Sequence, residues 1–390
     1  MQTFDGLTED TTTERQHAAR HLVSGLSLAA PRQTPATFFE MDSTFAALED
    51  HGFKFNMHDL AYAPAGTRSS RAIGTGSSRS LSDTSGVEVI GKGSMGTIYK
   101  ASLRLRNGVR RDVAVKQLHD CERNSPTGSE QQQALLCEMM LGMQVKPHPN
   151  VVEFIGAIKH PSHGALLVVE LINGMDMQQY FEQHQAQRQD WRPKLKEALE
   201  WGRQVYSALD HLHTGDVQLM HRDVKPSNLV LFNRTVDSFE SVKLIDFGLA
   251  REVGRGERSP TWLQFDSFEC QSLSHLSERV QASLRDADLE ALDVTAQAGT
   301  YRYMAPEIVK GVCKYSAKVD VYSATMVLYF LVTGERPFKE VAIYDASQLT
   351  ALQGKRPSLE SIKSPAVREL LTLGWQEVTS LKIMVWLYLL

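Results

Sequence analysis

The sequence predicts an α+β protein in which a small antiparallel β-sheet with one helix is followed by a mainly helical region. Three features support this prediction. Between residues 87 and 116, short β-branched runs alternate with glycine and Asn-Gly turns, a pattern typical of antiparallel strands. Residues 195–212 place apolar side chains on one helical face, and residues 320–332 are apolar on nearly every side, as in a buried helix.

The elements of the first lobe follow one another closely along the chain. Strands are expected at residues 87–90, 97–103, 111–116, 151–158 and 165–171. A helix is expected at residues 129–145, because Ser129 and Gln132 have the spacing of a capping box and good helix formers follow. Helical periodicity replaces the strand pattern beyond Gly174, so a second lobe begins there.

Composition excludes several classes of protein. The net charge of -4 and the pI of about 6.4 give no global basic field for nucleic acid or anionic lipid. The cysteines are far apart and form no CxxC pair, which argues against a disulfide framework or a structural zinc site: Cys121, Cys137, Cys270 and Cys313. The N-terminus lacks the pattern of a secretory signal, and no membrane span is expected. We therefore expect a cytoplasmic location, with the nucleus as the alternative.

Residues 1–85 mix short apolar clusters with polar filler, and residues 66–85 consist mainly of Gly, Ser, Thr and Arg. A segment of this kind buries too little apolar surface to fold by itself. We therefore expect a disordered N-terminal region over residues 1–85 and a folded domain that begins near Val87.

A glycine-rich loop lies between the first two expected strands: Gly91, Lys92, Gly93, Ser94, Met95 and Gly96. Three glycines at this spacing are a weak signal alone, since dinucleotide-binding folds share them. There the glycines open a helix, whereas here residues 97–100 continue as a strand. The loop is thus predicted to be a hairpin tip whose backbone N–H groups can approach phosphate oxygens. A plain flexible turn is the alternative interpretation.

A lysine ends the mostly apolar strand at residues 113–116, where its ammonium group would face inward. A buried cation needs partners. Glu138 in the following helix can supply one carboxylate for Lys116, and ATP phosphates can supply the rest. Taken alone, a surface lysine on an edge strand would be the simpler interpretation.

The loop at residues 221–228 supplies three groups that phosphoryl transfer requires. Asp223 offers a carboxylate to accept a hydroxyl proton, Lys225 a cation for the migrating γ-phosphoryl group, and Asn228 an amide oxygen for Mg²⁺. Asp246 opens an Asp-Phe-Gly triplet after an apolar strand and offers a second Mg²⁺ ligand. This chemistry depends on positioning and on charge neutralisation.

Together these motifs resemble those of the eukaryotic protein kinases. The glycine loop, strand lysine, helix glutamate, His-Arg-Asp loop, Asp-Phe-Gly triplet and the Met-Ala-Pro-Glu run at residues 304–307 follow in the family's order over residues 86–375. The resemblance implies the bilobal protein kinase fold. It places the kinase domain at residues 86–378, with the N-lobe at 86–172 and the C-lobe at 173–378.

The resemblance implies ATP and Mg²⁺ as cofactors and assigns a role to each matching residue. The expected catalytic residues are Asp223 as the base, with Lys225 and Lys116, and the expected metal ligands are Asn228 and Asp246. The residues expected to bind the nucleotide are Ile90, Gly91, Lys92, Gly93, Ser94, Met95, Gly96, Thr97, Ile98, Ala114, Lys116, Glu138, Glu170, Ile172 and Asp176. Among these, the backbone of Glu170 and Ile172 would bind adenine and Asp176 the ribose, with Val169 as gatekeeper.

The acceptor is expected to be a serine or threonine of a protein substrate, because Lys225-Pro226 and Thr300 resemble the Ser/Thr kinases. Residues 299–307 look most like the tyrosine-kinase-like group, which includes the Raf-like and mixed-lineage kinases. The expected function is ATP-dependent phosphorylation in intracellular signalling, under an upstream activating kinase. The alternative is a catalytically impaired kinase-fold scaffold or nucleotide-binding pseudokinase. A small-molecule phosphotransferase has little support, since the Ala-Pro-Glu run shapes a peptide site.

Two departures from the family pattern concern regulation. Residues 251–298 make the activation segment longer than usual, and Thr295 within it is the expected phosphorylation site. Gly142 stands one turn after Glu138, where most kinases carry an apolar residue that stacks toward Phe247. Met143 can compensate; the alternative expectation is that the helix docks more loosely and that activity depends more on an activator.

The end of the chain departs further. Gly374 replaces the usual cysteine, and the apolar residues 379–390 match nothing in the family, so the C-lobe is expected to be truncated. The arginine that usually pairs with Glu307 is missing. A buried carboxylate left unpaired costs about 3–5 kcal/mol. Lys382 is the candidate substitute, and low stability is the expected consequence without one.

Overall fold

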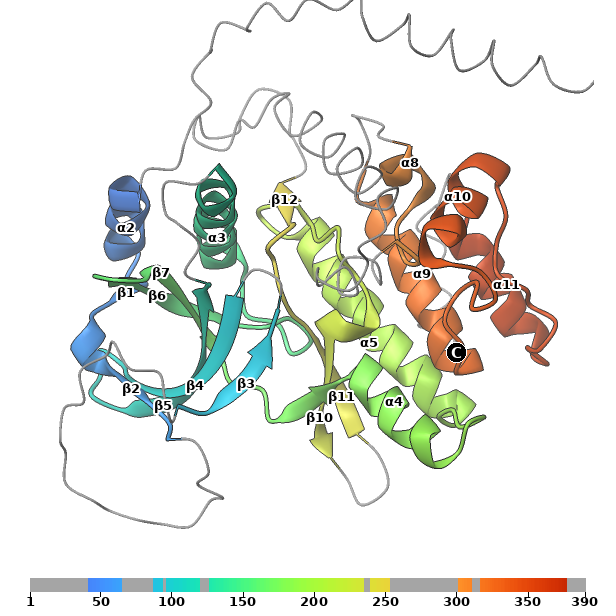
Figure 1. The fold of residues 1–390 in the computed structure, drawn as a ribbon, viewed down its shortest axis with the longest axis horizontal. Coiled ribbons are helices and arrows are strands. Elements are labelled where there is room, and N and C mark those ends of the chain that lie inside the picture. The colour runs from blue at the N-terminus through green and yellow to red at the C-terminus, as the bar shows by residue number, and fades with distance from the viewer. Residues whose placement is uncertain are drawn as a thin grey trace, which may run out of the picture. The chain divides into compact units, whose positions relative to one another are not determined.

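The computed structural model describes residues 41–64, 87–93, 96–119, 126–234, 239–252, 301–310 and 316–376. A curved β-sheet with two helices beside it forms the first lobe, and helices dominate the second (Figure 1). This arrangement confirms the predicted α+β class and the bilobal fold.

The N-lobe sheet has seven strands in the described part of the chain. They are β1 (Lys54–Phe55), β2 (Leu60–Tyr62), β3 (Val89–Lys92), β4 (Gly96–Arg104), β5 (Arg110–Leu118), β6 (Phe154–His160) and β7 (Gly164–Glu170). The order across the sheet is β1-β6-β7-β5-β4-β2, and β3 also pairs with β4. The β1–β6 pair is parallel and the other pairs are antiparallel. The five strands expected from the sequence are therefore present, with small shifts at their ends.

Two helices lie beside this sheet, α2 (Met41–Asp50) and α3 (Pro126–Gln144) (Figure 1). Helix α3 begins three residues before the expected position, so Ser129 lies inside the helix and the predicted capping box is wrong. Pro126 suits the first turn because its ring fixes a helical φ and the missing N–H would have had no partner there.

The expectation of disorder over residues 1–85 is wrong for residues 41–64, which fold into α2, β1 and β2. The physical reason is burial of the short apolar clusters: Phe45, Leu48, Phe55 and Leu60 are each less than a tenth exposed. These clusters are too sparse to form a core of their own, but the N-lobe sheet supplies the missing partner surface. Residues 1–40 and 65–86 lie outside the described part.

The C-lobe contains six helices and five short strands in its described residues. The helices are α4 (Met177–Gln187), α5 (Leu195–Thr214), α8 (Pro306–Val309), α9 (Lys318–Thr333), α10 (Ile343–Gln353) and α11 (Pro365–Gly374). The strands are β8 (Gly174–Asp176), β9 (Leu219–Met220), β10 (Leu229–Arg234), β11 (Phe239–Leu244) and β12 (Arg251–Glu252). Helix α9 is buried on nearly all sides, as its apolar sequence predicts.

The loop before β6 forms hydrogen bonds with the C-lobe. Val152 N donates to Leu244 O and Leu244 N donates to Asn150 O, both at 2.9 Å. The buried Asn150 side chain also donates to Val242 O at 2.8 Å and to Gln204 Oε1 at 3.0 Å. The chain that leaves α3 is therefore fixed to β11 and α5 of the C-lobe before it enters β6.

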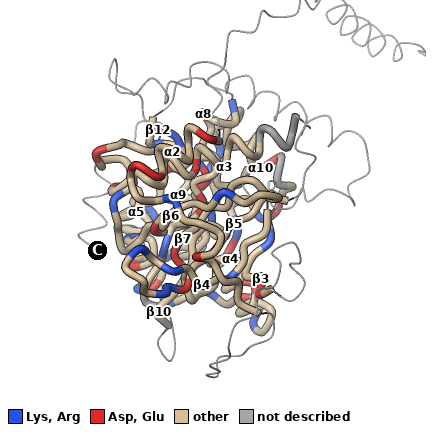
Figure 2. Tube along the Cα trace, turned by 90° about the vertical axis from the view of Figure 1, so that its left-hand side faces the viewer, with Lys and Arg blue, Asp and Glu red and all other residues tan. Residues whose placement is uncertain are grey.

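Charged residues are distributed over the whole described chain. Figure 2 shows lysine and arginine interspersed with aspartate and glutamate along the tube in this view. This mixing agrees with the small net charge of -4.

Gly374 permits close contact between α11 and α9. A Cβ atom at this position would lie 2.1 Å from Oγ1 of Thr325, a distance that atoms in contact do not reach. The same hydroxyl lies 2.6 Å from the hydroxyl of Tyr206 and donates to Val321 O at 2.7 Å. The departure from the family's cysteine is therefore matched by a threonine that occupies the space of its side chain.

The Gly374→Cys substitution is expected to lower the free energy of unfolding by about 1–3 kcal/mol, the usual effect of overpacking a filled core. Urea unfolding of both proteins measures this loss. Thr325→Ala in the same chain removes the clashing Oγ1, so the cysteine should then cost clearly less. An equal cost in both backgrounds would contradict the steric explanation.

Several expectations for the rest of the C-lobe fall on residues without a described structure. Residues 253–298 of the activation segment, Thr295, Thr300, Lys382 and the tail at 379–390 all lie outside the described ranges. Glu307 is described and is only half-buried, with no ion pair to a cation of the described chain. The expected penalty for a buried unpaired carboxylate therefore does not apply in full, because water still solvates this group.

Candidate active site

Lys116, Glu138 and Asp246 meet in one ion-pair cluster. The Nζ atom of Lys116 lies 2.8 Å from Oε2 of Glu138 and 2.8 Å from Oδ1 of Asp246. Lys116 stands on β5, Glu138 on α3, and Asp246 follows β11, so the cluster joins the N-lobe sheet, its helix and the C-lobe. The side chain of Lys116 is 14% exposed and that of Glu138 7%. The structure thus brings these three predicted residues together.

The charges of this cluster depend on one another. Burial alone would lower the pKa of Lys116, but the carboxylates of Glu138 and Asp246 outweigh it and raise that pKa. Burial raises the pKa of Glu138, and Lys116 opposes this only in part. Burial would also raise the pKa of Asp246, whereas Lys116 lowers it to about 2. Lys116 is therefore a cation and Asp246 an anion at neutral pH.

The catalytic loop places Asp223, Lys225 and Asn228 in contact. Asn228 Nδ2 donates to Oδ2 of Asp223 at 2.9 Å and also to the Asp223 carbonyl oxygen at 2.9 Å. Lys225 Nζ lies 2.7 Å from the same Oδ2. The other oxygen of Asp223, Oδ1, is buried and has no hydrogen-bond donor in the described chain. A buried acceptor without a donor is unfavourable, so this oxygen is available to a hydroxyl group from outside the protein.

Asp320 holds the backbone of this loop in place. Its carboxylate is fully buried and accepts hydrogen bonds from His221 N at 2.7 Å and Arg222 N at 2.6 Å. His213 Nε2 lies 2.8 Å from the same carboxylate. Burial would raise the pKa of Asp320, but the contact with His213 and the backbone donors lowers it overall. Sequence reasoning missed this role, although a single charge in an otherwise apolar helix was the available signal, since buried charges need partners.

The Asp-Phe-Gly triplet is anchored to the same loop. Asp246 has a φ of 69°, a left-handed backbone conformation, and Arg222 in the catalytic loop has a φ of 65°. Phe247 is 6% exposed and meets the ring of His221 edge to face at 5.3 Å. His221 Nε2 also lies 3.1 Å from Ile245 O. Strained backbone at these positions is stable because packing on both sides fixes it.

The glycine loop closes the hairpin of β3 and β4, as predicted. Gly91 lies opposite Ile98, and Gly93 N donates to Gly96 O at 2.9 Å. A Cβ at Gly96 would lie 2.3 Å from Gln117 O, so this glycine is required by the close pairing of β4 with β5. A Cβ at Gly93 would meet almost nothing, which leaves the backbone open to a ligand. Ser94 and Met95 lie outside the described residues, while Lys92 and Thr97 form the pair next to the turn.

The residues expected around adenine lie on β5, on β7 and in the hinge, which is the segment 170–173 that leads from β7 into the C-lobe. Ala114 on β5 lies opposite Val169 on β7 and is 6% exposed. Ile172 N donates no hydrogen bond within the described chain, which leaves it available to an adenine nitrogen. Asp176 accepts a hydrogen bond from Gln179 N at 2.9 Å as the N-cap of α4. Ile90, by contrast, is 43% exposed.

The side chain of Glu170 has a structural role that the sequence did not reveal. Its Oε1 accepts a hydrogen bond from Glu153 N at 2.8 Å and forms an ion pair with Lys243 of β11. Lys243 also donates to Val151 O at 3.3 Å. Glu170 is thus bonded to the residue just before β6 on one side and to the C-lobe on the other, whereas only its backbone was expected to have a role.

Phe154 fills the space beside Gly142, where looser docking of the helix was expected. A Cβ at Gly142 would lie 3.1 Å from Cβ and Cγ of Phe154, the first residue of β6. The phenylalanine therefore fills the space that an apolar side chain on α3 would otherwise take. The contact between Glu138 and Lys116 is intact at 2.8 Å in this arrangement.

The donor set fits a magnesium ion that is shared with a nucleotide. Asn228 Nδ2 is engaged with Asp223, which leaves the amide oxygen free for another contact. Ile245 N donates to Asn228 O at 3.0 Å, so Asn228 and Asp246 lie on backbone segments that are bonded to each other. No group of three or more His, Cys, Asp or Glu side chains in the described residues could hold a metal by itself. Mg²⁺ suits this arrangement, since it commonly takes one or two protein ligands together with phosphates and water.

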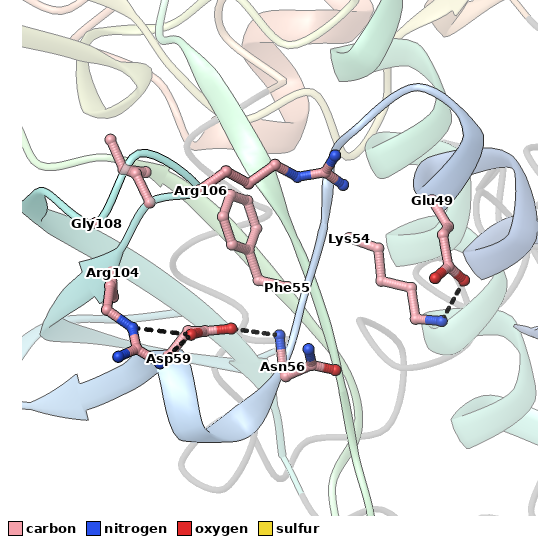
Figure 3. Close-up of a pocket in the computed structure, with 9 residues that line it drawn as sticks. Glu49, Lys54, Phe55, Asn56, Asp59, Arg104, Arg106 and Gly108 are labelled. Atoms are coloured by element: carbon pink, nitrogen blue, oxygen red, sulfur yellow. Dashed lines mark hydrogen bonds and ion pairs between the residues drawn. The ribbon is translucent and has the colours of Figure 1, made fainter.

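A pocket of about 460 Å³ lies in the N-lobe and is lined by other residues (Figure 3). Its lining comes from two parts of the N-lobe: Glu49, Lys54, Phe55, Asn56, Asp59, Arg104, Leu105, Arg106 and Gly108. Lys54 pairs with Glu49 at 2.5 Å and Arg104 with Asp59 at 3.2 Å, so much of its charge is neutralised internally. None of the expected site residues lines it, and it is therefore not the nucleotide site.

A two-lobed α+β domain with this lysine, catalytic loop and Asp-Phe-Gly triplet defines the protein kinases. The chain matches the protein kinase domain family over residues 85–372 and belongs to it. Its relatives are kinases of the tyrosine-kinase-like type. In the described residues, no helix has both the length and the apolar character that crossing a bilayer requires.

Three relatives illustrate the similarity. The serine/threonine-protein kinase VIK of Arabidopsis thaliana is 30% identical over 297 residues, which cover 75% of this chain and 56% of that protein. The serine/threonine/tyrosine-protein kinase HT1 of the same organism is 28% identical, with 71% and 59% covered. The serine/threonine-protein kinase TNNI3K of Rattus norvegicus is 29% identical, with 76% and 29% covered. The chain therefore spans between about a third and three fifths of the length of these relatives.

Proposed function

We propose that this chain is an ATP- and Mg²⁺-dependent protein kinase that transfers the γ-phosphoryl group to serine and threonine hydroxyls of protein substrates. The observation that carries the proposal is the buried Oδ1 of Asp223, which has no donor in the described chain and stands beside Lys225 and Asn228. A scaffold that only binds partners has no need for such an oxygen.

Each residue of the site has a defined task in this mechanism. Oδ1 of Asp223 accepts the proton of the substrate hydroxyl while its Oδ2 stays bonded to Asn228 and Lys225. Lys116, oriented by Glu138, presents its ammonium to nucleotide phosphates. Asn228 and Asp246 would hold Mg²⁺, which neutralises negative charge on the phosphates when bound. Lys225 faces the phosphoryl group during transfer and neutralises charge that develops there.

The balance of charges around Lys116 is consistent with a Mg²⁺ ion at Asp246. The single ammonium of Lys116 serves two carboxylates in the structure, those of Glu138 and Asp246. A second positive charge near Asp246 would allow Lys116 to turn toward a phosphate while Asp246 keeps a partner. Nucleotide affinity is therefore expected to depend strongly on Mg²⁺.

The test of the proposed function is phosphoryl transfer by the wild-type chain. Peptides that differ only in a serine, threonine or tyrosine acceptor should be offered with Mg²⁺ and ATP. Serine and threonine peptides should be phosphorylated well above the tyrosine peptide. Nucleotide binding without transfer to any acceptor would instead support the pseudokinase, and equal transfer to tyrosine would contradict the Ser/Thr assignment. We further propose a cytoplasmic location and activation by an upstream kinase, with Thr295 as the modified residue.

A further inference from the structure

Residues 41–64, named here the N-terminal strap, precede the family match, which begins at residue 85. The strap consists of α2, β1, a short 3-10 turn (Met57–Asp59) and β2. Strand β1 adds to the sheet beside β6, and β2 adds beside β4 at the other end of the strand order (Figure 1). A segment outside the shared kinase domain thus supplies both ends of the N-lobe sheet.

One hydrophobic cluster joins the strap to the helix that carries Glu138. Phe45 and Leu48 of α2 are 3% and 0% exposed. They belong to a buried cluster with residues of α3, β6 and β7: Leu135, Leu136, Met139, Ala157, Ala165 and Leu167. Met139 directly follows Glu138, and Leu167 is the cross-strand neighbour of Lys116. Glu138 therefore stands on a helix that this cluster packs onto β6 and β7, and Lys116 stands on β5, the strand paired with β7.

The ion pair cannot position α3 by itself. Removing Lys116 and Glu138 from water offsets most of their attraction, so a buried ion pair contributes little net stability. Apolar burial has no such penalty and grows with the area removed from water. The position of α3 over the sheet therefore depends on its apolar contacts, and α2 supplies two buried members of this cluster, Phe45 and Leu48.

We propose that the N-terminal strap is a built-in positioning element that keeps α3 packed against the sheet and so keeps Glu138 in contact with Lys116. The link to catalysis rests on the proposed function, in which Lys116 binds the nucleotide phosphates. Phe45 and Leu48 are positioning residues, because they act through α3 and touch no reacting group.

Gly156 gives a second way to move the strap, from a residue that belongs neither to α3 nor to the candidate site. A Cβ at Gly156 would lie 2.2 Å from Phe53 O and 2.7 Å from the ring of Phe55, so only glycine permits the strap to pass here. The adjacent Ala157 N donates to Phe53 O at 2.9 Å and forms the first bond of the added strand. One methyl group at position 156 is therefore expected to displace β1 and, with it, α2.

The experiment compares the full chain with two variants, Phe45→Ala/Leu48→Ala and Gly156→Ala, and with Asp50→Ala on the exposed side of α2 as the matched control. Amide hydrogen exchange is followed in α3 and, as an internal reference, in α9 of the C-lobe. Calorimetry measures the affinity for Mg²⁺ and ATP. In both variants α3 should exchange at least about tenfold faster while α9 does not change. The nucleotide affinity should fall between about 5-fold and 150-fold, the usual range of coupling between sites.

Three outcomes would overturn the proposal. Unchanged exchange in α3 would show that the strap does not hold this helix. Faster exchange with unchanged nucleotide affinity would remove the link to Lys116. Equal acceleration in α3 and α9 would show that the strap stabilises the whole domain and not the helix in particular. A wild-type chain that binds nucleotide but transfers no phosphoryl group would contradict the proposed function alone, and both measurements on the strap would remain interpretable.

Discussion

Alanine at Asp223 is expected to slow phosphoryl transfer by about 10²–10⁴-fold, the usual contribution of a general base. The physical reason is the loss of Oδ1, the buried oxygen without a donor in the described chain. Lys116 and Asp246 keep their 2.8 Å contact in this variant, so the affinity for Mg²⁺ and ATP should change little. The measurement is the rate of transfer to a generic serine or threonine peptide at saturating nucleotide.

The matched control is Asp190→Ala, which removes the same carboxylate from an exposed ion pair with Arg188. Its transfer rate should equal that of the wild type. Equal and measurable rates for wild type and Asp223→Ala would exclude Asp223 as the base. Absence of transfer by both proteins would leave only the scaffold interpretation.

Replacing Asp320 by alanine is expected to lower the free energy of unfolding by about 3–5 kcal/mol. The variant leaves the N–H groups of His221 and Arg222 buried without an acceptor, and it removes the partner of His213. Chemical denaturation of wild type and variant measures the difference. Transfer activity should fall as well, because the left-handed backbone of Arg222 loses its anchor. A loss below about 1 kcal/mol, the usual size of an exposed substitution, would contradict this role.

The same residue predicts a dependence on pH. The pKa of Asp320 is lowered in the folded state, since His213 and the backbone donors outweigh the effect of burial. The folded protein therefore favours the ionised form, and the stabilisation is present above the unfolded pKa of about 3.9. It is lost as the pH falls below that value toward the folded pKa. The difference in unfolding free energy between wild type and Asp320→Asn should accordingly shrink below about pH 4, and a difference that grows there would contradict the sign of the shift.

Much of the fold followed from local patterns. The strands between residues 87 and 171 and the helices α5 and α9 agree with the sequence prediction because their signals are strong and local: turn residues, period-2 or period-3.6 burial, and an uninterrupted apolar run. The start of α3 was missed because a capping-box spacing also occurs by chance inside helices. The strap was missed because its apolar residues fit a surface that the sequence does not display.

Some residues of the candidate site could likewise be identified from the sequence and others only from the structure. Lys116, Glu138, Asp223, Asn228 and Asp246 were identified from motif and spacing, and the structure brings them into two bonded clusters. The structural roles of Asp320, Glu170 and Phe154 were not identified. Each depends on a partner far away in the chain, and a motif records only neighbours in sequence.

The sequence by itself determined which groups are present and which chemistry they can perform, because phosphoryl transfer requires particular side chains in a fixed order along the chain. Only the tertiary structure decided how those groups are held. Asp320 fixes the catalytic loop from α9, Phe154 fills the space beside Gly142, and the strap packs α3 onto the sheet. These contacts depend on shape and on burial between segments far apart in the chain, and burial is set only when the whole domain has folded.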